Sequence, residues 1–233
     1  MKLINTAVVG ASSAAPSPLL TDLVAYWKLE NVNDSHTNGL TLTNNNSVTF
    51  TSGKVGNAAT VATASSQYAS LADTSILRPG NFDYTWLCWF KLTTTAGTQT
   101  IISKDYDTLR GWQLVNGGGT LTFNTYRNNS VGMDVNTPVS SGVWNLFIGW
   151  HDSVADTVNM KLNDGTTVSA ATSANFPQAT TAPFAIGRNS YPGFSQYMGG
   201  QVDEVAYWTR VLTAGEMTQL YNSGNGVTYP TFA

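Results

Sequence analysis

Apolar and polar residues alternate along the chain from residue 23 to residue 207, which is the pattern of half-buried β-strands. Gly, Asn, Asp and Pro interrupt the alternation at short intervals and mark turns. The pattern predicts eleven short strands, over residues 23–29, 47–50, 68–71, 84–92, 99–104, 111–115, 121–126, 144–151, 157–162, 184–187 and 200–208. Many short strands joined by turns indicate an all-β fold in which two antiparallel sheets pack face to face.

Two hairpin turns and one helix can be located in the sequence. Residues 163–165, Asn-Asp-Gly, separate two alternating segments, and Asp-Gly favours a tight hairpin because Gly tolerates a positive φ. Residues 116–119, Asn-Gly-Gly-Gly, predict a second hairpin. Thr213 stands three residues before Glu216, which is the signature of a helix capping box and predicts a helix over residues 213–221.

Length and composition favour one domain with short extensions. A sandwich of 233 residues can form a single domain. We expect an N-terminal arm over residues 1–21, the sandwich over residues 22–226 and a C-terminal tail over residues 227–233. The only cysteine, Cys88, lies in an apolar run and is expected to be a buried packing residue.

Charge and hydropathy exclude two classes of partner. Charged residues make up 11% of the chain, and the net charge is −3. The basic residues are scattered singly, whereas a nucleic-acid interface needs a basic patch or stripe, so we expect no nucleic-acid binding. No segment reaches the length of about 18 apolar residues that a membrane span requires.

A series of motifs runs from residue 23 to residue 224. They are LVAYWKL at 23–29, GKVGNA at 53–58, FDYTWLCWF at 82–90, IISK at 101–104, WQL at 112–114, AIGR at 185–188, GGQVDEVAYW at 199–208 and RVLTAGE at 210–216. In type and order they resemble the laminin-G-like domains of the concanavalin A-like lectin/glucanase superfamily. The resemblance implies a two-sheet jelly roll. It implies no single function, because the superfamily includes glycan-binding modules, adhesion domains, viral proteins and glycoside-cleaving enzymes.

The sequence lacks the carboxylate pattern of the hydrolases in this superfamily. Those enzymes present Glu-x-Asp-x-Glu on one strand, so that the carboxylates share a face and flank the glycosidic bond. This chain has three glutamates, Glu30, Glu204 and Glu216, and none lies in such a strand. Asp105 and Asp107 have the two-residue spacing, but they follow a predicted strand and occupy a loop. We therefore expect that the protein is not an enzyme.

The resemblance also implies a structural calcium ion that ties the opening loop to the closing strand. The matching positions are Asp203 in the closing strand and Asp34, together with backbone carbonyls of residues 33–39. Such a set suits a hard ion that takes roughly six to eight oxygen ligands. The alternative is that Asp203 caps a turn or accepts hydrogen bonds from backbone N–H groups of that loop.

Three loops carry the residue types that recognise sugars. The apolar C–H faces of sugars stack on aromatic rings, and their hydroxyls bond to amides, carboxylates and guanidinium groups. Trp112 can serve either in such a site or in the core. The alternatives are ordinary turns whose aromatic residues cover the sandwich edge, and contact with a protein partner. The candidate ligand-binding residues are Asp105, Tyr106, Asp107, Arg110, Trp112, Tyr126, Arg127, Arg188, Tyr191, Phe194 and Tyr197.

These features predict a non-catalytic recognition or adhesion module, outside the cell or on a virion surface, whose leading ligand is a glycan or a cell-surface polysaccharide. Within the arm of residues 1–21, residues 11–18 consist of Ala, Ser and Pro. We expect this arm to dock on other subunits of a larger assembly, such as a virus or phage particle, or else to fold back on the sandwich. The alternative functions are a secreted glycoside-active enzyme or its carbohydrate-binding module, and a purely structural protein–protein assembly domain.

Overall fold

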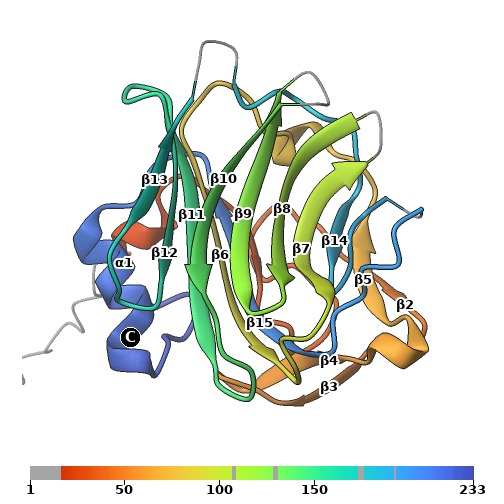
Figure 1. Ribbon diagram of the computed structural model, residues 1–233. Coiled ribbons are helices and arrows are strands. Elements are labelled where there is room, and N and C mark those ends of the chain that lie inside the picture. The colour runs from red at the N-terminus through yellow and green to blue at the C-terminus, as the bar shows by residue number, and fades with distance from the viewer. Residues whose placement is uncertain (1–16, 107–108, 128–130, 173–175, 192) are drawn as a thin grey trace, which may run out of the picture.

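The computed structural model is a sandwich of two antiparallel β-sheets (Figure 1). It describes residues 17–106, 109–127, 131–172, 176–191 and 193–233. The prediction of an all-β, two-sheet sandwich is confirmed, and each predicted strand corresponds to a strand of the structure.

The first sheet has eight strands. Along the hydrogen-bonded path their order is β13-β12-β11-β6-β15-β4-β3, and β1 pairs with β15 beside this path. The bounds are β1 Leu23–Trp27, β3 Thr49–Ser52, β4 Asn57–Val61, β6 Tyr84–Leu92, β11 Asn145–Asp152, β12 Thr157–Leu162, β13 Val168–Ala171 and β15 Gly200–Trp208.

The second sheet has seven strands, in the order β10-β9-β8-β7-β14-β5-β2. The bounds are β2 Thr43–Asn45, β5 Tyr68–Leu71, β7 Thr98–Tyr106, β8 Leu109–Gly117, β9 Thr120–Arg127, β10 Val131–Pro138 and β14 Phe184–Ile186. The sequence analysis missed β2, β4, β10 and β13. Of these, β2 and β13 are short edge strands and β4 consists mainly of small residues, so the apolar alternation is weak in all three. The edge strand β10 does alternate, with apolar residues at Val131, Met133 and Val135, and could have been recognised.

Two apolar clusters hold the sandwich together. The larger lies between the sheets, and β6 contributes Trp86, Cys88 and Phe90 to it. The alternate residues Leu87 and Trp89 face the other way, into a second cluster beneath the helix. Because β6 is buried on both faces, its residues 86–90 form an unbroken apolar run rather than an alternating one.

Helix α1, Ala214–Tyr221, and both ends of the described chain close the second cluster (Figure 1). Thr213 and Glu216 form the predicted capping box. The short 3-10 helix η1, Pro18–Leu20, buries Leu19, whose carbonyl accepts a hydrogen bond from Trp208 Nε1 at 2.8 Å. The described residues 17–21 and the tail thus contact the sandwich, while residues 1–16, most of the predicted arm, lie outside the described residues.

Three further 3-10 helices are short: η2 Thr63–Ser65, η3 Ser75–Leu77 and η4 Asn222–Gly224. Among the helices that the structure describes, none has the length and apolar character needed to cross a membrane.

Candidate functional site

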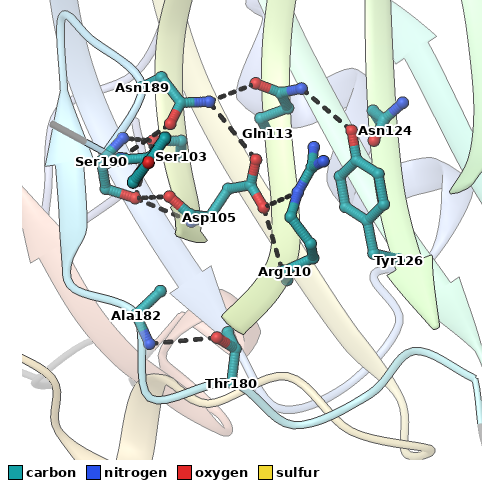
Figure 2. A network of polar contacts seen from close by, with 12 residues as sticks. Ser103, Asp105, Arg110, Gln113, Asn124, Tyr126, Thr180, Ala182, Asn189 and Ser190 are labelled. Carbon is teal, nitrogen blue, oxygen red and sulfur yellow. Dashed lines mark hydrogen bonds and ion pairs between the residues drawn. The ribbon is translucent and has the colours of Figure 1, made fainter. Parts of the chain in front are cut away.

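The outer face of the second sheet carries a connected set of polar side chains (Figure 2). On β8, Gln113 alternates with Trp112 and Leu114, which lie in the core between the sheets, so Gln113 faces outward. Its Nε2 donates a hydrogen bond to the Tyr126 hydroxyl on β9 at 3.2 Å. The two neighbouring strands therefore join their polar side chains on the side away from the core.

Asp105, near the end of β7, is at the centre of this set. Its side chain is 1% exposed. Oδ1 accepts a hydrogen bond from Arg110 Nε at 2.6 Å, and Oδ2 accepts one from Asn189 Nδ2 at 3.4 Å. Asn189 Nδ2 also donates to Gln113 Oε1 at 2.8 Å. Asp105 thus fixes the positions of the Arg110 guanidinium, five residues away, and of the Asn189 amide, which is 84 residues away in the chain.

Arg110 lies over the ring of Tyr126. The distance from its guanidinium carbon to the ring centroid is 3.6 Å, which is a cation–π contact. Burial raises the pKa of Tyr126 to about 12, so its hydroxyl keeps its proton at neutral pH. We refer to Asp105, Arg110, Gln113, Tyr126 and Asn189 together as the Arg110–Tyr126 platform.

The polar surface continues from the platform across β9 and β10. Asn124 Nδ2 donates a hydrogen bond to Asp134 Oδ1, and Thr122 Oγ1 donates to Asn136 Oδ1 at 2.6 Å. Asp134 and Asn136 are exposed. A row of amide, hydroxyl and carboxylate groups is therefore open to solvent along this edge of the sheet.

A pocket of about 180 Å³ opens on the same sheet. In this pocket, the Arg188 pocket, the guanidinium carbon of Arg188 lies 4.7 Å from the ring centroid of Tyr68. Ser190 Oγ donates to the Asp105 carbonyl at 2.6 Å, which connects the pocket to the platform. The pocket is lined by Tyr68, Ser70, Tyr106, Pro183, Phe184, Ala185, Arg188 and Ser190.

Aromatic residues surround the pocket. The Tyr191 ring makes edge contacts with Tyr106, at 5.1 Å between centroids, and with Phe194, at 5.0 Å. Tyr197 lies 5.0 Å from the Arg188 guanidinium carbon. Phe194 is 39% exposed, which makes it an accessible apolar contact beside the pocket.

The structure gathers most of the predicted ligand-binding residues into these two neighbouring groups. The prediction for Trp112 is wrong, because its side chain is fully buried between the sheets and its ring lies 4.6 Å from that of Trp86. Asp107 lies outside the described residues, as does the side chain of Arg127. The platform contains Asp105, Arg110 and Tyr126, and the pocket region contains Tyr106, Arg188, Tyr191, Phe194 and Tyr197.

Sequence reasoning missed Gln113, and it placed Asn189 and Ser190 in a candidate loop over residues 188–197 without selecting them as site residues. The position of Gln113 between two core residues of an alternating strand was a usable signal for an outward polar group. No local signal marks Asn189 or Ser190, because their partner Asp105 is 84 and 85 residues away in the sequence.

Asp203 and Asp34, the predicted calcium ligands, each accept three backbone hydrogen bonds. Asp203 accepts from the N–H groups of residues 54, 55 and 204 at 2.7, 3.0 and 2.9 Å. Asp34 accepts from those of residues 26, 36 and 40 at 3.0, 2.9 and 3.1 Å. Asp203 therefore caps the turn between β3 and β4, which is one of the two alternatives considered from the sequence; its hydrogen-bond donors lie in residues 54, 55 and 204 and not in the loop 33–39.

Glu204, next to Asp203, is buried, and its carboxylate oxygens have no hydrogen-bond partner of normal geometry among the described residues. Burial has the largest effect on the pKa of Glu204 and raises it, whereas a hydrogen-bonding interaction with the Tyr26 hydroxyl lowers it. Burial raises the pKa of Asp203 to about 7 and that of Glu204 to about 8. No cluster of three or more His, Cys, Asp or Glu suited to a metal ion occurs in the described part of the chain. A cation here would take most of its ligands from backbone carbonyls and water.

The two-sheet jelly-roll sandwich is the fold of the concanavalin A-like lectin/glucanases superfamily. The family model Laminin_G_3, of the concanavalin A-like lectin/glucanases superfamily, matches residues 62–218. The chain belongs to this family, as the motifs of the sequence predicted. No curated protein sequence matches the chain.

Several solved structures share the fold at low sequence identity. The binding domain of Paraclostridial Mosquitocidal Protein 1 has a TM-score of 0.73 and 14% identity, over 87% of this chain and 52% of that one. Domain 4 of AbnA, a GH43 extracellular arabinanase from Geobacillus stearothermophilus in complex with arabinotriose, has a TM-score of 0.69 and 22% identity, over 84% and 97%.

A structure of botulinum neurotoxin type C, whose entry into cells depends on interaction with two ganglioside molecules, has a TM-score of 0.66 and 11% identity. The match covers 87% of this chain and 51% of that one. The chain thus spans about half the length of the toxin domains and nearly the whole length of the arabinanase domain. At these identities the likeness shows a common fold.

Proposed function

We propose that this domain is a non-catalytic glycan-binding module that acts outside the cell, and that its site is the Arg110–Tyr126 platform with the adjoining Arg188 pocket. The observation that carries the proposal is the hydrogen-bonded network from Asp105 to Arg110, Asn189 and Gln113. This network fixes the partly exposed Arg110 guanidinium in place before a ligand arrives, with the buried Asn189 and Gln113 as supports, which lowers the entropy cost of binding.

The surface offers both kinds of contact that a sugar makes. The exposed Asp134 and Asn136 provide hydrogen-bonding groups for hydroxyls, and Tyr191 and Phe194 provide rings for C–H faces. The arabinotriose complex of the similar arabinanase domain supports a glycan ligand.

The geometry of Asp105 supports binding rather than hydrolysis. A general acid or nucleophile needs a carboxyl group directed at the glycosidic bond, whereas both oxygens of Asp105 accept hydrogen bonds from Arg110 and Asn189. Glycoside cleavage is the second candidate function, since the superfamily includes glucanases.

The test is titration of the protein with a panel of neutral and acidic oligosaccharides, arabinan fragments included, followed by calorimetry and by assay of released reducing ends. Arg110→Ala is expected to weaken binding at least about tenfold, or roughly 1.4 kcal/mol. Thr51→Ala is the matched control, because Thr51 is exposed on β3 of the other sheet and bonds to Thr60 at 2.7 Å. Absence of binding to every glycan refutes the proposal, and released reducing ends favour the enzyme.

A structural cation at Asp203 is a second, separate proposal. The observation that favours it is the buried carboxyl group of Glu204 beside Asp203, which has no hydrogen-bond partner of normal geometry among the described residues and whose ionised form a cation would stabilise. Attachment of residues 1–21 to other subunits, in a virus or phage particle or elsewhere, stays a prediction from the sequence.

A further inference from the structure

The Arg188 pocket differs from the rest of the proposed site in its charge. Among its lining residues Arg188 is the one charged side chain, and none is Asp or Glu. The nearby acids are already paired with other cations: Asp105 with Arg110 at 2.6 Å, and Asp73 with Lys104 at 2.7 Å. No carboxylate of the described lining therefore compensates the guanidinium.

Arg188 is held rigidly and retains unused donors. It is 6% exposed. Nε donates to the Asn189 carbonyl at 2.6 Å, Nη1 to the Tyr197 hydroxyl at 3.2 Å and Nη2 to the Tyr191 carbonyl at 2.9 Å. A guanidinium has five N–H donors, so among the described contacts one remains on each terminal nitrogen. A guanidinium that keeps a donor on each of its two terminal nitrogens can bind the two oxygens of a carboxylate.

The surroundings of the guanidinium strengthen this preference. Buried charges in proteins are normally paired or bonded, and an anion brought to an unpaired buried cation gains more than it does in water. Tyr68 and Tyr197 stabilise Arg188 through their rings, at 4.7 and 5.0 Å from its guanidinium carbon, but they bring no negative charge. The positive charge is thus available to a ligand.

The size of the pocket limits what enters. At about 180 Å³ it is smaller than the roughly 300–1,000 Å³ of pockets that enclose drug-sized ligands. It suits one terminal sugar unit, with the remainder of a chain lying over the platform and the aromatic residues beside it.

We propose that the Arg188 pocket selects a terminal acidic sugar, whose carboxylate is bound by the Arg188 guanidinium. This inference rests on the proposed glycan-binding function and specifies its ligand class. A hexuronic acid and a sialic acid share the required chemistry, and the test separates them.

The experiment measures binding of the wild-type protein to methyl glycosides of glucuronic acid, galacturonic acid and N-acetylneuraminic acid, each against its own methyl ester. The ester keeps the shape and removes the charge. We expect each acid that binds to bind at least about tenfold more tightly than its ester, or roughly 1.4 kcal/mol, with the difference shrinking at high salt. Arg188→Gln is expected to abolish the difference, and Arg188→Lys, which keeps the charge without the two-donor geometry, to restore part of it.

The results distinguish the two proposals. Equal binding of acids and esters to the wild type overturns the acidic-sugar inference and leaves glycan binding in place. A preference for acids that persists in a folded Arg188→Gln protein also overturns it. If neither these glycosides nor the neutral panel bind, both proposals fail. The comparison of acid with ester uses the wild type alone, so a variant that does not fold leaves the inference falsifiable.

Discussion

Replacement of Glu216 by Gln is expected to destabilise the domain in a pH-dependent way. The Glu216 carboxylate accepts hydrogen bonds from both terminal nitrogens of Arg210, at 2.8 and 2.7 Å, and from the Thr213 backbone N–H at 2.8 Å. Arg210 also donates to the carbonyls of Thr21 and Pro18, at 3.0 and 3.2 Å. One carboxylate therefore links the start of α1, the segment after β15 and the N-terminal segment.

The size of the expected stability loss follows from the proton affinity of Glu216. The hydrogen bonds from Arg210 are the main cause that lowers the pKa of Glu216 from 4.5 to about 2. A tenfold change in proton affinity is about 1.4 kcal/mol, so the ionised carboxylate contributes at most about 3 kcal/mol to the free energy of unfolding. The two side chains are 19% and 13% exposed, and solvent screening reduces the expected value to about 1–2 kcal/mol.

The sign of the pH dependence follows as well. The pKa of Glu216 is lower in the folded state than in the unfolded state, so its contribution is fully present above pH 4.5 and disappears as the pH falls through about 2. Urea denaturation of the wild type and Glu216→Gln at several pH values measures the difference directly. We expect the difference at about pH 3 to be less than half of that at neutral pH.

Asp164→Asn is the control. Asp164 pairs with Lys161 at 2.7 Å on a hairpin, and its side chain is 47% exposed, so we expect little change at any pH. An equal loss for Glu216→Gln at pH 7 and at about pH 3 would refute the reasoning, because it would assign the effect to packing or capping rather than to the ionised carboxylate.

Three further predictions concern the platform, the cation and the core. Asp105→Ala should lower the free energy of unfolding by about 1.5–3 kcal/mol, since the substitution removes the charge-assisted hydrogen bonds of a buried carboxylate. Urea denaturation measures this loss, and a loss no larger than that of Thr51→Ala contradicts the prediction. Removal of calcium with a chelator should lower the Tm of the wild type and leave Asp203→Asn unchanged; the absence of a bound cation in metal analysis and an unchanged Tm contradict the site. Tyr207→Phe should keep or raise the Tm, because the buried Tyr207 hydroxyl has no hydrogen-bond partner among the described residues; a Tm lowered by several degrees contradicts this.

The sequence alone determined the local structure, because its causes are local. Side chains on a strand point alternately to opposite faces, so alternation in the sequence identifies strands and the faces of their residues. The helix at Ala214–Tyr221 was equally predictable, since its capping box joins residues three apart. The edge strands β2 and β13 were missed because they are short and carry few apolar residues, whereas β10 has an alternating apolar pattern that was overlooked.

The site depended on which strands become neighbours in the sheets. Local sequence does not specify the neighbours, because the backbone hydrogen bonds between antiparallel strands are the same for every pair. Asp105 and Asn189 meet because β14 pairs with β7, with Ala185 opposite Ser103. Packing likewise placed the ring of Trp112 in the core rather than on the surface, a choice that its aromatic character left open. The capped turn at Asp203 was decided in the same way, by the return of β15 to the side of β4, about 150 residues earlier in the chain. The order of the strands in the folded sheets, which only burial of the whole core selects, assembled the platform and the Arg188 pocket from residues that carry no common signal in the sequence.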